Sequence, residues 1–588
     1  MLSKDSNWYD ALAARDDLIQ YGGNAIGLFA LALRFHIDDI HSVAAESVTD
    51  GHNDKKCDLI YLDKEAGVVI VAQCYSSQKP KPSAPSNKAT DLNAAVSWLL
   101  HGAIETLPNR LRVSAKEIRE ALITGEVKRF ELWYVHNLPE SKNVKEELKT
   151  AELTASSLID SLTCKYPVTI SSTEIGSKIL ENWYKETLSP ILVNDEIKFE
   201  ISSGFEIAEG NWRAYVAPIK ARELHKLYKA HKTSLFSANV RDYLGSRKSD
   251  ANINNGIKQT AQDEAQNFWV FNNGITVLTH SFEEKEEKGR RYIVVKGISI
   301  VNGAQTTGAL GSLSKAPDQN VLVPARFVAT SDSELVYNII QYNNSQNKVS
   351  ASDFRSTDRI QKRLRDEISK IPSACYEGGR RGGHRDVIER NKNLLPSYTV
   401  GQSLAAYNLE PVIAYNQKSE IWVNDKLYSK YFNDDSSGVN LVFAFGLLRA
   451  VEETKSNLVS KSKKIDSLTS QEETLLAYFR HRGSTYLFVS AVSSCLEVFV
   501  KQKVTNPAHI SFGPKTSPKQ SMQAWKDVVD IISPFTTQLV DALDDGLKST
   551  EKVQKAIIAF KSLVQATSQA NADVYKKFAK KITIEKSA

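Results

Sequence analysis

Amide and hydroxyl side chains gather in two short segments whose spacing suits binding chemistry. Residues 271–276 (Phe-Asn-Asn-Gly-Ile-Thr) and 300–307 (Ile-Val-Asn-Gly-Ala-Gln-Thr-Thr) run from apolar residues through Asn-Gly to small hydroxyl residues. Asn and Gly adopt positive φ easily, so both segments predict a sharp turn at the end of a strand. Because Asn-Gly turns are common, an ordinary junction between strand and turn also explains either segment taken singly.

A third polar cluster follows at residues 343–347, after a helical pattern over 335–342. All three clusters come at the ends of elements, where clefts form in open α/β sheets. Uncharged donors and acceptors suit recognition of a base, sugar or phosphate better than proton transfer at pH 7. We therefore predict one cleft that binds a nucleotide or nucleic acid. Its candidate ligand-binding residues are Asn272, Asn273, Asn302, Gln305, Thr306, Asn343 and Asn344.

Five ordered motifs within residues 210–410 resemble the AIPR family, the abortive-infection phage-resistance proteins of bacteria. The similar segments are 239–245, 254–260, 268–276, 301–307 and 343–353. The resemblance implies an anti-phage defence protein with a central AIPR domain. Many members of that family also carry a nuclease-like domain in front of it.

One constellation in the first third of the chain bears on that expectation. Residues 57–62 and 68–74 predict a β-hairpin with Asp58 in its first strand and Gln73 near the end of its second, and Glu46 lies upstream. This layout resembles the PD-(D/E)xK nuclease fold, where carboxylates hold a divalent metal that polarises the scissile phosphate. The resemblance implies catalytic roles for Asp58, Gln73 and Glu46, with Asp58 and Glu46 as ligands of Mg²⁺.

The match departs from that nuclease pattern at one position. Tyr75 stands where the fold has the lysine that orients and activates water, and the nearest lysines, Lys79 and Lys81, lie in a proline-rich loop. A tyrosine cannot replace the charge of an ammonium group. The alternative is that Asp58 and Gln73 are polar residues of an ordinary hairpin, or the remnant of an inactive nuclease.

Arginines supply the candidate anion-binding groups. Arg241 lies in an apolar frame, where it either binds an anion or pairs with a carboxylate. Residues 377–385 combine glycines, which let the backbone approach a phosphate, with Arg380 and Arg381, which we expect to border the cleft and bind phosphate. A surface loop without a ligand is the alternative. The arginines at 355, 359 and 363 predict either a salt-bridged surface helix or a phosphate-facing stripe.

The pattern of elements predicts three domains, since 588 residues exceed a single core. We expect a restriction-endonuclease-like α/β domain at 1–200, a mixed α/β AIPR domain at 205–435 and a helical domain at 436–588. In the middle domain, residues 268–271 and 292–301 read as strands, and residues 283–291 read as a charged hairpin that forms a solvated loop. The helical domain carries no catalytic cluster and offers a surface for a homo-oligomer.

Composition limits the remaining possibilities. The net charge of +6 comes from 75 basic and 69 acidic residues that are interspersed, which permits a nucleic-acid partner without requiring one. Five scattered cysteines predict neither a zinc site nor disulfides and favour the cytoplasm. We expect no signal peptide and no membrane partner, because the most apolar stretch, 25–33, is too short to span a bilayer. The leading hypothesis is metal-dependent cleavage of DNA or RNA, and the alternative is an inert nucleotide or nucleic-acid sensor.

Overall fold

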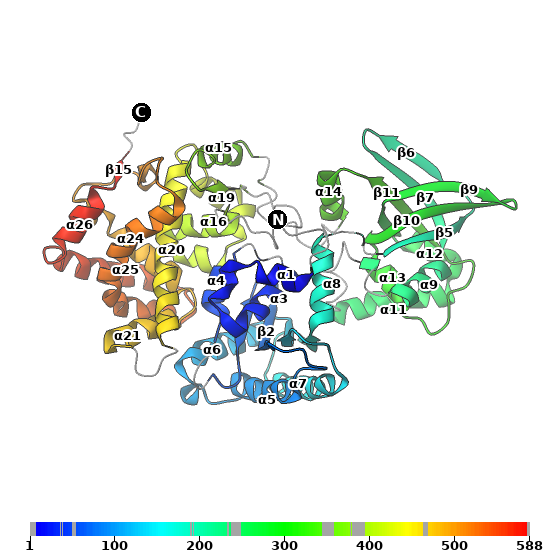
Figure 1. The fold of residues 1–588 in the computed structure, drawn as a ribbon, viewed down its shortest axis with the longest axis horizontal. Helices are drawn as coiled ribbons and strands as arrows, with labels where there is room; N and C mark the ends of the chain where they lie inside the picture. Colours follow the sequence, from blue (N-terminus) through cyan, green and yellow to red (C-terminus); the bar gives the residue numbers. More distant parts are fainter. Residues whose placement is uncertain are drawn as a thin grey trace. The chain divides into compact units, whose positions relative to one another are not determined.

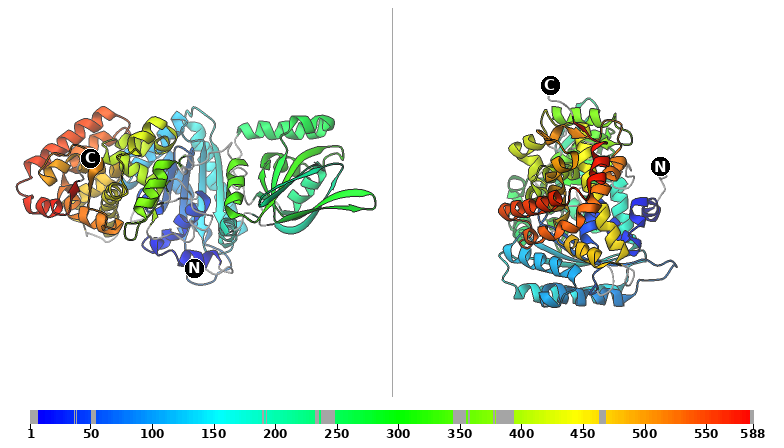
Figure 2. Two further views of the ribbon diagram at one scale, coloured as in Figure 1. Left: turned by 90° about the horizontal axis from the view of Figure 1, so that it is seen from above. Right: turned by 90° about the vertical axis from the view of Figure 1, so that its left-hand side faces the viewer.

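The chain divides into two compact units, which we describe separately. One unit combines residues 1–180 with 350–382 and 386–588, and the other combines 181–349 with 383–385. The predicted domain boundaries near residues 200 and 435 stay predictions. The computed structural model describes residues 7–35, 37, 39–49, 54–188, 191, 193–231, 235–236, 248–343, 355, 358–376, 378, 394–462 and 468–584 (Figures 1 and 2).

The first unit contains a four-stranded sheet, which we call the front sheet. Its strands are β1 (Leu59–Asp63), β2 (Val68–Tyr75), β3 (Arg129–His136) and β4 (Thr169–Ile175), in the order β1-β2-β3-β4. The predicted hairpin is β1 paired antiparallel with β2, and β2-β3 and β3-β4 are parallel. Seven consecutive residues of β2 are buried, as expected for a strand that is covered on both faces.

Helices cover both faces of the front sheet. The helices α5 (Ser86–Leu100), α6 (Asn109–Thr124) and α7 (Lys142–Ser161) share one hydrophobic core with the strands. Helix α3 (Ala25–Phe35) lies on the other face, so close that a Cβ added to Gly27 would stand 2.4 Å from the sulfur of Cys74. The α/β layering expected of this region is therefore present.

The rest of the first unit is mostly helical, with two short two-stranded sheets, and most of its helices share a single core. Its longest members are α16 (Ser397–Tyr407), α20 (Gly438–Lys461), α22 (Ser484–Ser494), α24 (Pro518–Ile532) and α25 (Thr550–Ala566). This core runs from residue 364 to residue 578 and contains two fully buried tryptophans, Trp422 and Trp525. The helical character predicted after residue 436 is confirmed, and residues 397–431 pack into the same core.

The second unit is built on a larger sheet, the middle sheet, with the order β5-β10-β8-β11-β7-β6 and β9 attached to β10. Strands β8 and β11 are parallel, and the other neighbours are antiparallel. The strands are β5 (Val193–Ile201), β6 (Phe205–Glu209), β7 (Trp212–Lys220), β8 (Ile275–Thr279), β9 (Ser281–Glu287), β10 (Arg290–Asn302) and β11 (Leu322–Thr330).

Different helices cover the two faces of the middle sheet. Helices α9 (Ala221–His231), α11 (Lys248–Asp263) and α13 (Ala304–Gly311) contribute to the core on one face. Helix α14 (Ser333–Asn343) packs on the other face against Leu278, Val301 and Val328. Among the described residues, no helix has both the length and the apolar character that crossing a bilayer requires.

One prediction about the middle sheet was wrong, and a second was correct only in part. Residues 268–271 form a short helix, α12 (Phe268–Phe271), because only Phe268 is buried and nothing pairs with the segment as a strand. The charged hairpin predicted at 283–291 is present, but most of its residues belong to the strands β9 and β10 rather than to a loop. Cross-strand ion pairs such as Arg291 with Glu284 join the exposed side chains of the two strands, while Phe282, Ile293 and Val295 are buried in the core of the middle sheet.

Candidate functional site

Polar side chains form a row across the front sheet. Extending the β1-β2 register by one residue places Asp58 opposite Gln73, and the parallel pairs add Tyr134 and Glu174 to the same row. Register partners in neighbouring strands point to the same face of a sheet and lie about 5 Å apart. The sequence prediction that Asp58 faces Gln73 across the hairpin matches this placement, and their catalytic roles stay predictions.

The two members of this row on the hairpin are buried. Asp58 is 9% exposed, and its Oδ2 accepts a 2.7 Å hydrogen bond from the backbone N–H of Cys74. Gln73 is 1% exposed, and its amide nitrogen donates to the carbonyl oxygen of Lys56. The Gln73 Oε1 is buried without a hydrogen-bond donor among the described residues. An oxygen that can still accept a donor or a cation therefore lies beside the Asp58 carboxylate.

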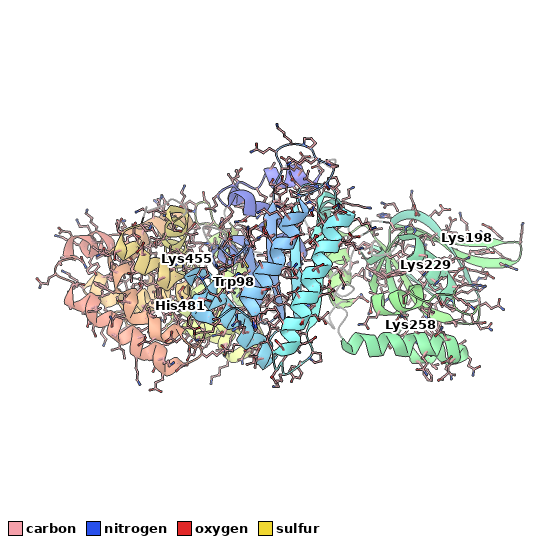
Figure 3. The ribbon with its side chains drawn as sticks, turned by 90° about the horizontal axis from the view of Figure 1, so that it is seen from below. Trp98, Lys198, Lys229, Lys258, Lys455 and His481 are labelled. Atoms are coloured by element: carbon pink, nitrogen blue, oxygen red, sulfur yellow. The ribbon has the colours of Figure 1, made fainter. Side chains whose placement is uncertain are left out.

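Glu46 lies in helix α4 (Ile40–Ser47), and its described contacts are with the helical part of the first unit. Its Oε1 accepts a hydrogen bond of 3.5 Å from the backbone N–H of Gly483. It also interacts electrostatically with the buried Arg482 and with the buried Lys455, which is labelled in Figure 3. Burial lowers the pKa of Lys455, and the neighbouring Glu46 opposes that shift. Within the described part of the chain, no three His, Cys, Asp or Glu residues are grouped to hold a metal.

A lysine does reach the end of β2. The Lys81 Nζ donates a 3.0 Å hydrogen bond to the phenolic oxygen of Tyr75, two residues beyond Gln73. This hydrogen bond, together with one from Ser77, lowers the pKa of Tyr75 below its ordinary value. The proline-rich loop thus brings an ammonium group to the strand end where the nuclease pattern has its lysine.

His136 and Glu174 form a buried pair at the carboxyl ends of β3 and β4. The His136 Nε2 lies 3.0 Å from Glu174 Oε1, and the backbone N–H of Leu138 donates to His136 Nδ1 at 3.3 Å. Since Nδ1 accepts, Nε2 carries the proton that goes to Glu174. Both ring nitrogens are occupied, and Glu174 also accepts from the backbone N–H of Ser141 at 3.0 Å. This pair holds the loop before α7 and leaves no nitrogen for catalysis.

In the middle sheet, the two Asn-Gly turns pack against each other. Gly274 and Gly303 have φ of +78° and +88°. A Cβ added to Gly303 would lie 2.6 Å from the carbonyl oxygen of Gly274, and one added to Gly274 would lie 2.2 Å from that of Pro324. Only glycine fits at these two positions. The contact brings the start of β8, the end of β10 and the start of β11 together at one edge of the sheet.

Arg326 connects the third polar cluster to these turns. Register places Thr276 beside both Asn302 and Arg326. The Arg326 Nη2 donates to Thr276 Oγ1 at 3.0 Å and to Asn343 Oδ1 at 2.8 Å. Asn343 is held in turn by a 2.8 Å hydrogen bond from its Nδ2 to the carbonyl oxygen of Ile339. Asn302, Asn343 and both turns thus belong to one region, which we call the turn edge.

The other predicted ligand-binding residues fall partly within the described chain. Asn272 ends α12, where its Nδ2 donates to the carbonyl oxygen of Phe268 at 3.1 Å, and Asn273 is exposed. Gln305 is exposed and Thr306 is buried in the first turn of α13. Arg241, Asn344, Arg380 and Arg381 lie outside the described residues. The cleft and its ligand stay predictions.

The sequence analysis missed Arg326. A usable signal was present, because an arginine interrupts the apolar pattern of residues 321–328. In contrast, the arginines at 355, 359 and 363 are occupied within the protein. Arg355 pairs with Asp425, Arg359 pairs with Asp434 at 3.2 Å, and Arg363 donates to the carbonyl oxygen of Ser436 at 2.7 Å. The salt-bridged alternative therefore describes these three, and α15 begins only at Arg359 (Arg359–Ile368).

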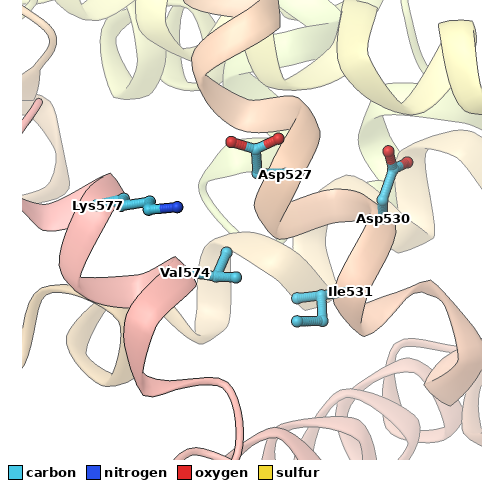
Figure 4. A pocket seen from close by; sticks show the side chains of 5 residues that line it. All are labelled: Asp527, Asp530, Ile531, Val574 and Lys577. Carbon is cyan, nitrogen blue, oxygen red and sulfur yellow. The ribbon is translucent and has the colours of Figure 1, made fainter.

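A pocket also lies between α24 and α26 (Ala572–Ala579), but it contains none of the predicted site residues (Figure 4). Its lining combines both charge signs with apolar groups, and Asp530 already pairs with Lys526 at 2.7 Å. The lining residues are Asp527, Asp530, Ile531, Val574 and Lys577.

Comparison with known proteins gives one match. Residues 236–503 match the family model described as "AIPR protein". The matched range contains both Asn-Gly turns, Arg326 and part of the helical core, and it leaves out the front sheet. No curated protein and no solved structure matches the chain.

Proposed function

We propose that this chain is a bacterial anti-phage defence protein that cleaves nucleic acid with a divalent metal at the front sheet. The AIPR match supports the defence role, because that family is associated with abortive-infection phage resistance. The observation that carries the nuclease role is the unsatisfied Gln73 Oε1 beside the Asp58 carboxylate. A buried oxygen without a donor costs about 1–3 kcal/mol, and a cation would remove that cost.

The chemistry of these donors fits Mg²⁺, which prefers carboxylate and amide oxygens. Asp58 and Gln73 would hold the ion, with Glu46 as a further ligand once it leaves the N–H of Gly483. The ion would supply polarisation of the scissile phosphate. Lys81, hydrogen-bonded to the Tyr75 hydroxyl, would orient the attacking water and place its positive charge close to the phosphate.

A cleavage assay on the full chain tests this proposal. Wild type, Asp58→Asn and Gln73→Leu are incubated with single- and double-stranded DNA and RNA, with Mg²⁺ or with EDTA. Asp58→Asn should lower the rate by more than about a hundredfold, because even an outer-shell partner of a metal costs ten- to a hundredfold. Asp63→Asn, the same substitution at the other end of β1, is the control. Cleavage that survives both EDTA and Asp58→Asn would contradict the proposal.

A second candidate function is a catalytically inert sensor that binds a nucleotide or nucleic acid through the turn edge. The observation that favours it is the convergence of Asn302, Asn343 and the two turns around Arg326. Retention of a labelled oligonucleotide without cleavage of any substrate would select this function. For either function we propose action in the cytoplasm, and association into a homo-oligomer through the helical part.

A further inference from the structure

Arg326 is an exposed arginine without an acidic partner among the described residues of its unit. Its side chain is fixed by hydrogen bonds to Thr276 and Asn343, and it forms no ion pair with any residue that the structure describes. The groups that hold this guanidinium, among the residues that the structure describes, are a neutral hydroxyl and a neutral amide.

Other arginines of the same sheet show the ordinary arrangement. Arg213 pairs with Glu206 at 2.6 Å, and Arg291 pairs with Glu284. Both are exposed to solvent, so exposure alone does not leave an arginine of this sheet unpaired. The difference at Arg326 is that its neighbours are neutral amides and hydroxyls.

The guanidinium is held in a way that leaves donors for a ligand. Its two protein hydrogen bonds both use Nη2, and Nε and Nη1 have no acceptor among the described residues. The Nε–H and Nη1–H groups therefore remain to donate to phosphate oxygens, and the guanidinium charge strengthens such hydrogen bonds. Because Thr276 and Asn343 already fix the side chain, binding would cost less rotamer entropy than with a freely moving arginine.

The beginning of α13 adds donors at the turn edge. Gly303 is the N-cap of this helix, and no side chain caps its first turn. A helix N-terminus favours an anion. The buried Thr307 Oγ1, one turn into α13, has no hydrogen-bond partner in the described structure.

Aromatic side chains lie exposed on the element that enters the same edge. In α12, Trp269 is 40% exposed and Phe271 is 62% exposed, and Asn272 and Asn273 follow directly. Large aromatic rings are usually buried, and exposed rings beside cationic groups are the arrangement on which nucleobases stack.

We propose that Arg326, with Thr276, Asn302 and Asn343, binds the phosphate of a nucleotide or of a single-stranded nucleic acid, whose base stacks on Trp269 or Phe271. This proposal rests on the second candidate function and names its ligand chemistry and its central residue. It does not depend on the front sheet.

The test is a binding titration of the full chain in EDTA, with fluorescein-labelled single-stranded DNA and RNA as probes. Unlabelled ATP, GTP and inorganic phosphate are the competitors. Arg326→Gln keeps an amide donor for Thr276 and Asn343 but removes the charge. It should weaken binding at least about tenfold, the usual consequence of losing a charge-assisted hydrogen bond. It should also reduce the salt slope by about 0.7 per lost phosphate contact.

The control is Arg291→Gln, which removes an exposed arginine of the same sheet that has a carboxylate partner. It should leave the dissociation constant within about twofold of wild type, since exposed ion pairs contribute little. Trp269→Ser should weaken the binding of the oligonucleotides and the nucleotides but not the binding of inorganic phosphate. If thermal unfolding shows that Arg326→Gln is not folded, Arg326→Lys is used in its place. Lysine keeps the positive charge but lacks the several N–H donors of the guanidinium group.

The possible outcomes distinguish a failure of the Arg326 site from a failure of the sensor function. Competition by ATP or GTP identifies a free nucleotide, and binding of the strands alone identifies a backbone phosphodiester; both support the site. Strong binding by wild type that Arg326→Gln or Arg326→Lys leaves unchanged overturns the role of Arg326 and keeps the sensor function. If wild type binds none of these probes, the sensor function and the site fail together.

Discussion

The two sheets use a similar row of polar residues in opposite ways. In the front sheet, Asp58 and Gln73 are buried and almost every polar atom has a partner within the protein. At the turn edge, Arg326 is exposed and carries donors that the described residues do not use. The buried oxygens of the front sheet suit the cation that we propose there, and the exposed guanidinium of the turn edge suits the anion that we propose there. The difference lies in burial more than in the choice of residues.

The largest effect should come from breaking the contact that builds the turn edge. Gly303→Ala places a side chain at φ +88° and within 2.6 Å of the Gly274 carbonyl oxygen. We expect a loss of about 2–5 kcal/mol in the free energy of unfolding, from the left-handed conformation and from overpacking together.

Gly289→Ala is the matched control for this prediction. Gly289 has φ of +73°, but an added Cβ there would meet nothing within 4 Å. Only the conformational cost of about 1–2 kcal/mol should appear. Equal losses in chemical unfolding of the two variants would show that the packing of the two turns contributes no stability.

A smaller effect should test the cation that we propose for the front sheet. Mg²⁺ that binds only the folded protein should stabilise wild type by about 2.7 kcal/mol at a hundred times its dissociation constant. Asp58→Asn should abolish the resulting shift in thermal midpoint, and Arg326→Gln should leave it unchanged. A shift that persists in Asp58→Asn would place the metal elsewhere.

The pH dependence of the first unit should show a weaker effect. Burial lowers the pKa of His41, although Asp39, Asp17 and Glu452 oppose this shift and Arg449 assists it. Because the folded pKa is depressed, the contribution to stability is complete above the unfolded value near 6.5 and is lost as pH falls through the folded pKa. His41→Gln should reduce the change in the free energy of unfolding between pH 7 and pH 5, which urea unfolding measures. An unchanged pH profile would contradict this assignment.

The smallest effect concerns the lysine that reaches Tyr75. Lys81→Met should raise the pKa of Tyr75 toward its ordinary value, because the hydrogen bond from Lys81 is the largest cause of the depression. Titration of ¹³C-labelled tyrosine by NMR measures this shift, with Tyr75→Phe to assign the signal. A Tyr75 titration that is indifferent to Lys81 would remove the lysine from the proposed site.

Sequence patterns predicted those structural features that depend on residues close together in the chain. The β1-β2 hairpin, the glycine turns at 274 and 303 and the helices after residue 436 all follow from period and turn chemistry. The strand predicted at 268–271 was wrong because a run of four apolar residues is compatible with a short helix as well as with a strand. The hairpin at 283–291 was expected to be a solvated loop because its ion pairs join residues on different strands, which a run of charged residues does not reveal.

Long-range contacts explain the remaining differences at the candidate sites. Glu46 faces Gly483 because of how α4 meets the helical part, and no pattern near residue 46 contains that information. Arg326 looked like a solvent-facing residue of a strand until the register showed Thr276 beside it and the helix α14 brought Asn343 to its guanidinium.

The contact between Glu46 and Gly483 also determines how late during synthesis this unit can be completed. It joins residues 437 positions apart within one compact unit. At the usual 5–20 residues per second, synthesis of the intervening chain takes about 20 to 90 s. Throughout that interval the front sheet lacks the helices that bury Glu46 and Glu117 beside Arg482. A ribosome that stops early therefore releases a front sheet without its buried counter-charges, so translation must reach the last third of the chain before this unit can be completed.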